Sequence, residues 1–172
     1  MCGIFSIISK KETIKITDIL ASFEEGRKRG PEENQIKQLK DTIIFGFHRL
    51  AINGVSDITS MQPFNINNCV LICNGEIYNW KKLYRQMNIT PRTGSDCEVI
   101  IHCYNKYGIT QTLQLLDGVF AFILFDKKNN NIFIARDSYG IRPLFISKDD
   151  NTYLFASEMK SLINVCYRKN KI

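Results

Sequence analysis

The sequence predicts an α+β fold in which antiparallel sheets are built from hairpins and the helices are segregated from the strands. Two pairs of apolar runs are each joined by a short polar turn, at 127–131 and 149–151, as in hairpins. This order favours antiparallel sheets with segregated helices over alternating parallel units. The segment 119–125 is apolar on both faces and needs cover on both sides, so two stacked sheets with outer helix layers would suit it.

Short apolar and aromatic runs predict the strands. They lie at 3–9, 42–48, 70–73, 119–125, 132–135, 144–147 and 152–156. The strand that begins at residue 70 is expected to stop at Asn74-Gly75, a pair common in hairpin turns. Residues 51–64 include Gly54 and Pro63 among polar residues and are expected to form a loop.

Apolar residues at helical spacing predict the helices. They lie at 16–23, 80–87, 95–107 and about 113–116. The first ends before Gly30-Pro31. Ser95 and Glu98 form a capping-box pair at the start of the third, and Gly108 closes it. A last helical turn is expected to begin near Ser157.

The bulk composition is that of one globular domain spanning residues 1–172. A chain of 172 residues that is 44% hydrophobic and 23% charged can bury a core and is ordinary for a soluble protein. The formal net charge of +6 comes from lysines and arginines scattered among acids, apart from short basic runs at 27–29 and 168–171. We therefore expect no nucleic-acid partner. Since no apolar run approaches membrane-spanning length, we expect no membrane partner either.

The cysteines are expected to be reduced core residues in a cytoplasmic protein. No signal-peptide pattern precedes Cys2, and the chain is too rich in core residues for a disulfide-stapled miniature. The spacings from Cys69 to Cys73 and from Cys97 to Cys103 do not match zinc sites. The sequence therefore predicts no metal site.

Cys2 is the candidate nucleophile. Removal of Met1 would give one residue both a thiol and a free α-amino group. Such an amine has a reference pKa of about 7.7–8.0, so it can act as the base that a thiol nucleophile needs. The alternative is an incidental cysteine, because a lone cysteine at position 2 is weak evidence.

A set of motifs in a fixed order strengthens this interpretation. They are MCGIF at 1–5, RKRGPE at 27–32, HRLAI at 48–52, QPF at 62–64, CNGEIYN at 73–79, TGSDCEVI at 93–100, DGVFAF at 117–122, FD at 125–126, RDSYGIRPL at 136–144 and ASEMKSL at 156–162. Together they resemble the class II glutamine amidotransferases, and in particular the N-terminal glutaminase domain of glutamine-hydrolysing asparagine synthetases. The resemblance covers nearly the whole chain.

The resemblance implies a four-layer αββα sandwich of two antiparallel sheets, of the N-terminal-nucleophile hydrolase type. It also implies hydrolysis of glutamine to glutamate and ammonia through a thioester on Cys2. Asn74 and Gly75 would then form an oxyanion hole, from a side-chain amide and a backbone N–H.

The same resemblance supplies the expected glutamine-binding residues. Arg49 would bind the α-carboxylate bidentately, and Asp96 and Glu76 would bind the ammonium. Asp96 lies in a first helical turn, where the helix dipole favours a negative charge. The remaining pocket residues are expected to be Leu50, Ala51, Ile52, Asn53, Asn74 and Gly75.

Other motif residues are interpreted as structural. Arg136-Asp137 and Arg142 are expected to fix a loop after a hairpin strand. His48 is expected to be a structural histidine whose hydrogen bonds are satisfied, and a surface ion pair is the alternative for Arg49.

The acceptor of the ammonia is the open part of this prediction. No pyrophosphate-binding loop of the Ser-Gly-Gly-x-Asp-Ser type occurs, so ATP and magnesium would belong to a missing or separate synthetase domain that makes asparagine from aspartate. This chain itself is expected to need no cofactor. Lys28 and Glu32 depart from the family pattern, and the motif at 140–144 also occurs in amidophosphoribosyltransferases. The alternatives are a subunit of that or another amidotransferase, a stand-alone glutaminase, and a catalytically silent glutamine-binding module.

Overall fold

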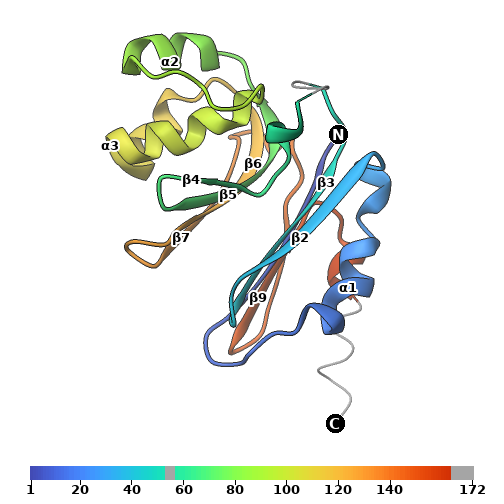
Figure 1. The fold of residues 1–172 in the computed structure, drawn as a ribbon. Helices are drawn as coiled ribbons and strands as arrows, with labels where there is room; N and C mark the ends of the chain where they lie inside the picture. Colours follow the sequence, from blue (N-terminus) through green and yellow to red (C-terminus); the bar gives the residue numbers. More distant parts are fainter. Residues whose placement is uncertain (53–56, 164–172) are drawn as a thin grey trace. The chain divides into compact units, whose positions relative to one another are not determined.

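The computed structural model describes residues 1–52 and 57–163, which divide into two compact units (Figure 1). Unit 1 is formed by Met1–Leu50 together with the chain from Pro143 onward, and unit 2 is Ala51–Arg142. Unit 1 is thus discontinuous in sequence, whereas unit 2 is one uninterrupted segment. The expectation of a single domain over 1–172 stays a prediction.

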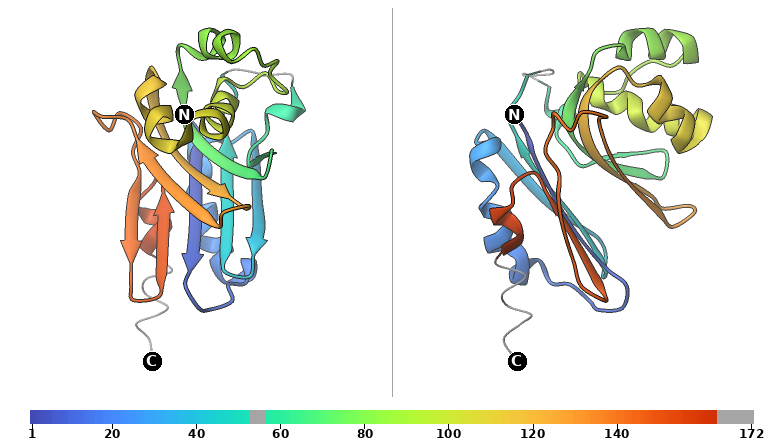
Figure 2. Two further views of the ribbon diagram at one scale, coloured as in Figure 1. Left: turned by 90° about the vertical axis from the view of Figure 1, so that its left-hand side faces the viewer. Right: turned by 180° about the vertical axis from the view of Figure 1, so that it is seen from behind.

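Unit 1 contains a five-stranded sheet in the order β2-β3-β1-β9-β8, and every pairing in it is antiparallel. Its elements are β1 (Gly3–Ser9), α1 (Ile16–Glu24), η1 (Arg27–Arg29), β2 (Glu33–Lys40), β3 (Ile43–Arg49), β8 (Phe145–Lys148) and β9 (Thr152–Ala156). The strand that follows Cys2 is therefore central, flanked on both sides by hydrogen-bonded neighbours (Figure 2).

Helix α1 packs on one face of this sheet. Ile19 and Phe23 project from the helix into a core that contains Phe5 and Ile44 of the central strands. Position 46 must be glycine for this packing, because a Cβ there would lie 2.6 Å from the Phe23 ring. The glycine in the sheet thus leaves room for the Phe23 ring on the apolar face of the helix.

Unit 2 contains a four-stranded antiparallel sheet in the order β4-β5-β6-β7. Its elements are η2 (Ile58–Ser60), β4 (Phe64–Ile66), β5 (Cys69–Ile77), α2 (Trp80–Met87), η3 (Asp96–Glu98), α3 (Val99–Leu115), β6 (Gly118–Asp126) and β7 (Asn131–Arg136). Helices α2 and α3 cover one face of this sheet (Figure 1).

Alternation along β5 separates its side chains into two groups. Leu71, Cys73 and Ile77 belong to the core that includes residues of α2 and α3. Since successive side chains of a strand point to opposite faces, Asn74 and Glu76 lie on the face turned away from these helices. Residues Phe120 through Asp126 of β6 are all buried.

Several sequence predictions need correction. Strand β2 was missed, because most of its residues are polar and exposed and it lies at a sheet edge. Asn74-Gly75 does not form a turn: β5 continues through both residues to Ile77. By contrast, the predicted third and fourth helices both occur within Val99–Leu115, and Gly108, whose backbone is not helical (φ 75°, ψ 172°), separates them as expected.

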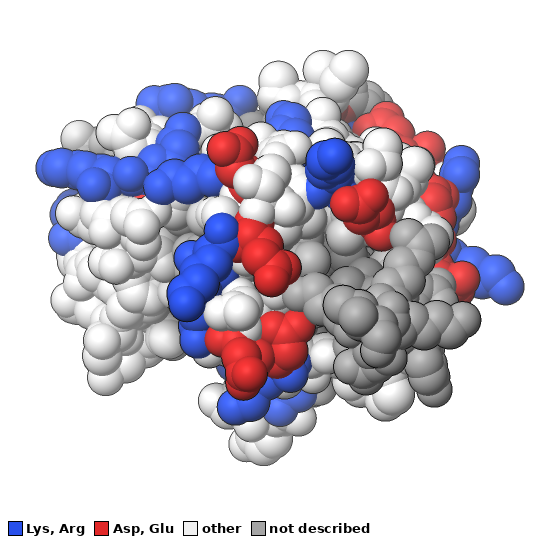
Figure 3. Space-filling view, turned by 90° about the horizontal axis from the view of Figure 1, so that it is seen from below, with Lys and Arg blue, Asp and Glu red and all other residues white. Residues whose placement is uncertain are grey.

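The fold class is confirmed as α+β, with two antiparallel sheets and accompanying helices. A helical turn also begins at Lys160, close to the expected position. On the surface in Figure 3, lysines and arginines interleave with acidic side chains, as the scattered charge of the sequence predicts. Within the described ranges, no helix is both long and apolar enough to cross a membrane, and no cluster of three or more possible metal ligands occurs.

Candidate functional site

Cys2 lies immediately before the central strand of the unit 1 sheet. Its thiol is half-buried and donates to the Leu50 carbonyl oxygen at 3.4 Å. Its own carbonyl oxygen accepts from Arg29 Nε at 3.0 Å, and Arg29 also forms an ion pair with Glu158. The backbone of the candidate nucleophile is therefore held in place while its thiol stays partly accessible. The role of Arg29 was not predicted from its motif.

Arg49 ends β3 and is nearly buried, at 5% exposure. One of its terminal nitrogens lies 3.3 Å from a carboxylate oxygen of Glu33, its cross-strand neighbour on β2. The ion pair considered as the alternative is therefore present, although the guanidinium is buried rather than on the surface. Because the Glu33 side chain is 50% exposed, the pair is solvated from one side. Such a pair can rearrange when a carboxylate ligand binds Arg49.

His48 packs in the interior of unit 1 as expected, but only one of its two ring nitrogens has a hydrogen bond among the described residues. Its Nε2 donates to the Phe23 carbonyl oxygen at 2.8 Å, and its ring stacks on that of Phe23 at 4.0 Å. Its other ring nitrogen, Nδ1, is buried with no hydrogen-bond partner among the described residues. Burial is the main cause that lowers the pKa of His48. The histidine is therefore neutral at physiological pH.

Among the predicted site residues of unit 2, Asn74 has the surroundings that point most directly to a binding or catalytic role. The residue is 2% exposed, and its Nδ2 is buried without a hydrogen-bond partner in the described part of the chain. Leaving such an amide unpaired costs about 1–3 kcal/mol. An unpaired donor that persists despite this cost is suited to a group that binds only during a reaction.

Gly75 presents a backbone N–H at an edge of β5 that β4 does not cover. Strand β4 pairs only with Cys69–Leu71, and further along the edge Gln62 bonds both backbone groups of Cys73, at 2.6 and 3.1 Å. Hydrogen-bonding directions alternate along an antiparallel strand, so the Gly75 N–H points to the same edge as that of Cys73. A Cβ at Gly75 would lie 2.6 Å from the Val119 carbonyl oxygen, which explains the glycine.

Glu76 is already engaged by a cation. One of its oxygens lies 2.6 Å from a terminal nitrogen of Arg142. Asp137 holds the loop that carries Arg142: its carboxylate accepts from four backbone N–H groups, those of Phe120, Tyr139, Ile141 and Arg142. This confirms the structural interpretation of Asp137, whereas that of Arg142, whose side chain contacts a predicted site residue, stays a prediction. An ammonium at Glu76 would have to share the carboxylate with Arg142.

Asp96 is buried at 4% exposure, and its Oδ2 accepts from the Ile77 backbone N–H at 2.6 Å. This bond ties the acid to the same edge of β5 that carries Gly75. Unit 2 thus brings together Asn74, Gly75, Glu76 and Asp96, whereas unit 1 holds Cys2, Arg49 and Leu50. The roles assigned to these residues stay predictions.

Three predicted pocket residues are less informative. Ala51 is partly exposed, Ile52 is 53% exposed, and Asn53 lies outside the described residues. A cavity of about 410 Å³ in unit 2 contains none of the predicted site residues. It is lined by Trp80, Lys81, Tyr84, Arg85, Asn88, Ile89, Thr90 and Pro91. The cavity is therefore not the candidate catalytic site.

The comparisons with known proteins identify the class. The family model described as the glutamine amidotransferase domain matches residues 1–172, and the chain belongs to this family. Among curated proteins, asparagine synthetase (glutamine-hydrolyzing) of Gallus gallus is 42% identical over 171 residues, and those of Bos taurus and Homo sapiens are 39% and 37% identical. Each match covers 96% of this chain, which spans 30% of the length of these relatives.

Solved structures agree with the class. A glutamine phosphoribosylpyrophosphate amidotransferase from B. subtilis has a TM-score of 0.75 at 25% identity, covering 96% of this chain and 44% of that one. A structure described as the allosteric regulatory enzyme of purine biosynthesis has a TM-score of 0.81 at 24% identity, covering 96% and 43%. The chain is therefore a glutamine amidotransferase domain homologous to the glutaminase region of asparagine synthetases.

Proposed function

We propose that this chain hydrolyses glutamine to glutamate and ammonia through a γ-glutamyl thioester on Cys2. The observation that carries the proposal is the buried Nδ2 of Asn74, which has no hydrogen-bond partner among the described residues, next in sequence to the edge-directed N–H of Gly75. Two such donors suit the oxyanion that forms when a thiolate attacks an amide carbon. Membership of the amidotransferase family supplies the substrate class.

In the proposed mechanism the Cys2 amine, free once Met1 is removed, takes the thiol proton as the sulfur attacks the side-chain amide carbon (Cδ) of glutamine. The same proton passes to the leaving nitrogen, which departs as ammonia when the tetrahedral intermediate collapses. Water then attacks the thioester and releases glutamate. Asn74 and Gly75 stabilise the oxyanion in both steps.

Substrate recognition is assigned to three charged residues. Arg49 binds the α-carboxylate of glutamine, replacing or sharing its contact with Glu33. Asp96 binds the α-ammonium, because it is a buried carboxylate next to the proposed oxyanion donors. Glu76 assists through the part of its carboxylate that Arg142 does not occupy.

We further propose that the ammonia is consumed by an ATP-dependent domain that converts aspartate to asparagine. Support comes from the curated relatives, which are named as asparagine synthetases and are more than three times as long as the matched region. The chain given glutamine, aspartate and Mg-ATP should release glutamate without asparagine. Asparagine formation by the chain alone would contradict the assignment of that step to another domain.

The test of the glutaminase measures glutamate release from glutamine by wild type and by Cys2→Ala, with intact mass recorded to establish removal of Met1. Cys69→Ala, which removes a buried thiol of unit 2, is the control. Hydroxylamine added to the wild type should divert product to γ-glutamyl hydroxamate, because it intercepts a thioester. Glutamate release that survives in Cys2→Ala, or its absence from wild type that lacks Met1, would refute the proposal.

A further inference from the structure

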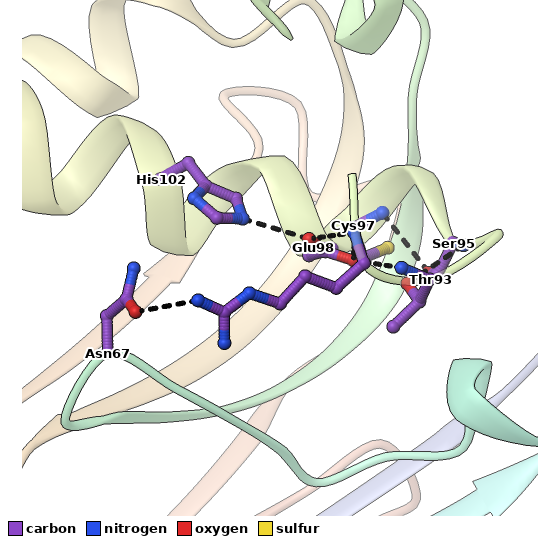
Figure 4. Close-up of polar contacts among 7 residues, drawn as sticks. Asn67, Thr93, Ser95, Cys97, Glu98 and His102 are labelled. Atoms are coloured by element: carbon purple, nitrogen blue, oxygen red, sulfur yellow. Dashed lines mark hydrogen bonds and ion pairs between the residues drawn. The ribbon is translucent and has the colours of Figure 1, made fainter. Parts of the chain in front are cut away.

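Glu98 makes an unusual set of contacts just after Asp96 (Figure 4). The residue is fully buried, and Oε1 accepts from the Arg92 backbone N–H and from His102 Nε2, each at 2.9 Å. Oε2 accepts from the backbone N–H groups of Arg92 and Thr93, at 3.1 and 2.6 Å. The capping-box prediction is thus partly wrong, because Glu98 reaches past Ser95 to the loop before it.

Every backbone N–H from residue 92 to 95 is held by a side-chain oxygen. Glu98 takes the first two, Asp57 accepts from Gly94 at 2.7 Å, and Thr93 Oγ1 accepts from Ser95 at 3.2 Å. These bonds fix the path of the loop residue by residue. The loop leads directly into Asp96.

The charge of Glu98 is stabilised by its surroundings. Burial alone would raise the pKa of the Glu98 carboxyl, but His102 and the loop N–H groups outweigh it and hold this pKa below its usual value. An ionised carboxylate only accepts hydrogen bonds. The hydrogen bond between His102 and Glu98 is therefore donated by the N–H at Nε2 of His102. His102 is itself buried and sits one helical turn further along α3.

The loop is fixed at Glu98 and at β5, and Asp96 lies between these two points. On one side, the carboxylate of Asp96 accepts from Ile77 N–H at 2.6 Å. On the other, Glu98 holds the loop at Arg92 and Thr93, four and three residues before Asp96. A shift of the loop would therefore displace the Asp96 carboxylate from the edge of β5. A displacement of about 1 Å at a binding group is enough to impair it.

We propose that Glu98, oriented by His102, is the positioning residue that sets the specificity of this domain for ligands with an α-ammonium group, by holding Asp96 in place. The inference rests on the proposed function, in which Asp96 binds the ammonium of glutamine. Glu98 and His102 touch no substrate. Their effect is transmitted through the backbone of residues 92–95.

The test compares two competitive inhibitors, L-glutamate and glutarate, which differ in the α-ammonium group. Glu98→Gln replaces an acceptor by an amide whose NH2 faces the loop N–H groups. It should raise the Ki of glutamate by about 10–100-fold, the range expected for a hydrogen bond to a charged group, and leave the Ki of glutarate within about 3-fold. His102→Leu should act in the same direction, whereas His102→Gln, which keeps an N–H donor, should restore most of the glutamate affinity.

Asp126→Asn is the matched control. Asp126 is also a buried carboxylate of unit 2 that holds a turn, and it accepts from Lys128 N, Asn129 N and the Tyr104 hydroxyl. It lies opposite the Cys69 end of β5, whereas Asp96 binds β5 at Ile77, the other end. It should lower the melting temperature without changing the ratio of the two Ki values. If Glu98→Gln does not fold, the comparison of His102→Leu with His102→Gln carries the test.

The outcomes separate the two proposals. Two outcomes would overturn the positioning role, provided that the wild type is active. In the first, Glu98→Gln loses affinity for glutamate and glutarate equally; in the second, it loses affinity for neither. A wild type without Met1 that neither hydrolyses glutamine nor binds glutamate would instead overturn the proposed function. A selective loss of glutamate affinity that is absent from Asp126→Asn supports the positioning role.

Discussion

Replacement of Asn74 by leucine should make the protein more stable and much less active. Leucine reproduces the branched shape of asparagine without polar atoms, so the buried Nδ2, which has no partner in the described chain, disappears. Removing an unsatisfied buried donor relieves about 1–3 kcal/mol. For a chain of 172 residues, each kcal/mol corresponds to roughly 2–4 °C in melting temperature. Losing one oxyanion donor should lower kcat about 10²–10³-fold.

The assay pairs thermal unfolding with glutamate release for wild type, Asn74→Leu and Cys2→Ala. Cys2→Ala should abolish release with little change in stability, because its side chain is only half-buried. A fall in melting temperature for Asn74→Leu would show that the amide contributes to the fold, and turnover within 10-fold of wild type would show that it is not an oxyanion donor. Either result would refute the argument from the unpaired amide.

Three further predictions concern His48, the thiols and Gly75. Because the pKa of His48 is lowered in the folded protein, the unfolded chain takes up the His48 proton at a higher pH than the folded protein does. The free energy of unfolding should therefore fall as pH drops below about 6.5, by up to about 1.4 kcal/mol per pH unit. In His48→Phe, urea unfolding at pH 7.5 and 5.5 should show a smaller difference; an unchanged difference would exclude His48 as the source. Iodoacetamide should label Cys2 well before Cys103, whose thiol pKa burial raises to about 11; comparable labelling in native protein would contradict the structure. Gly75→Ala should lose about 1–3 kcal/mol of stability as well as activity, because its Cβ would press on the β6 backbone, and a wild-type melting temperature would disprove that clash.

The central strands could be predicted from the sequence because they are apolar, and the edge strand β2 could not. The run Glu33–Lys40 has almost no buried side chains, so its strand conformation depends on pairing with β3 rather than on its own composition. At Asn74-Gly75 the error is the reverse: the sequence predicts the end of a strand, and the strand continues. A pair typical of turns lies inside β5 because the strand continues along β6, and tertiary pairing overrides the local preference.

The candidate site was predicted by motif, and its supporting contacts were not. Asn74, Asp96 and Arg49 could be chosen because the resemblance assigns them chemistry. Glu98 was interpreted as a helix cap, since capping is what its spacing from Ser95 indicates. Its contact with Arg92 depends on how the loop folds back, which no local pattern in the sequence encodes.

The discontinuous build of unit 1 has a consequence for the order of folding during synthesis. Strand β1 follows the candidate nucleophile, yet one of its two partners, β9, lies far later in the sequence: Phe5 pairs with Ala156, 151 residues further on. Unit 2 is a continuous segment whose contacts can form as soon as it leaves the ribosome. The first strand to be made is thus among the last to be fully paired, because its pairing with β9 waits for residues near the end of the described chain. A nascent chain that stops short of β9 would carry Cys2 on an incomplete sheet, so the surroundings of this residue are complete only when the domain is almost fully synthesised.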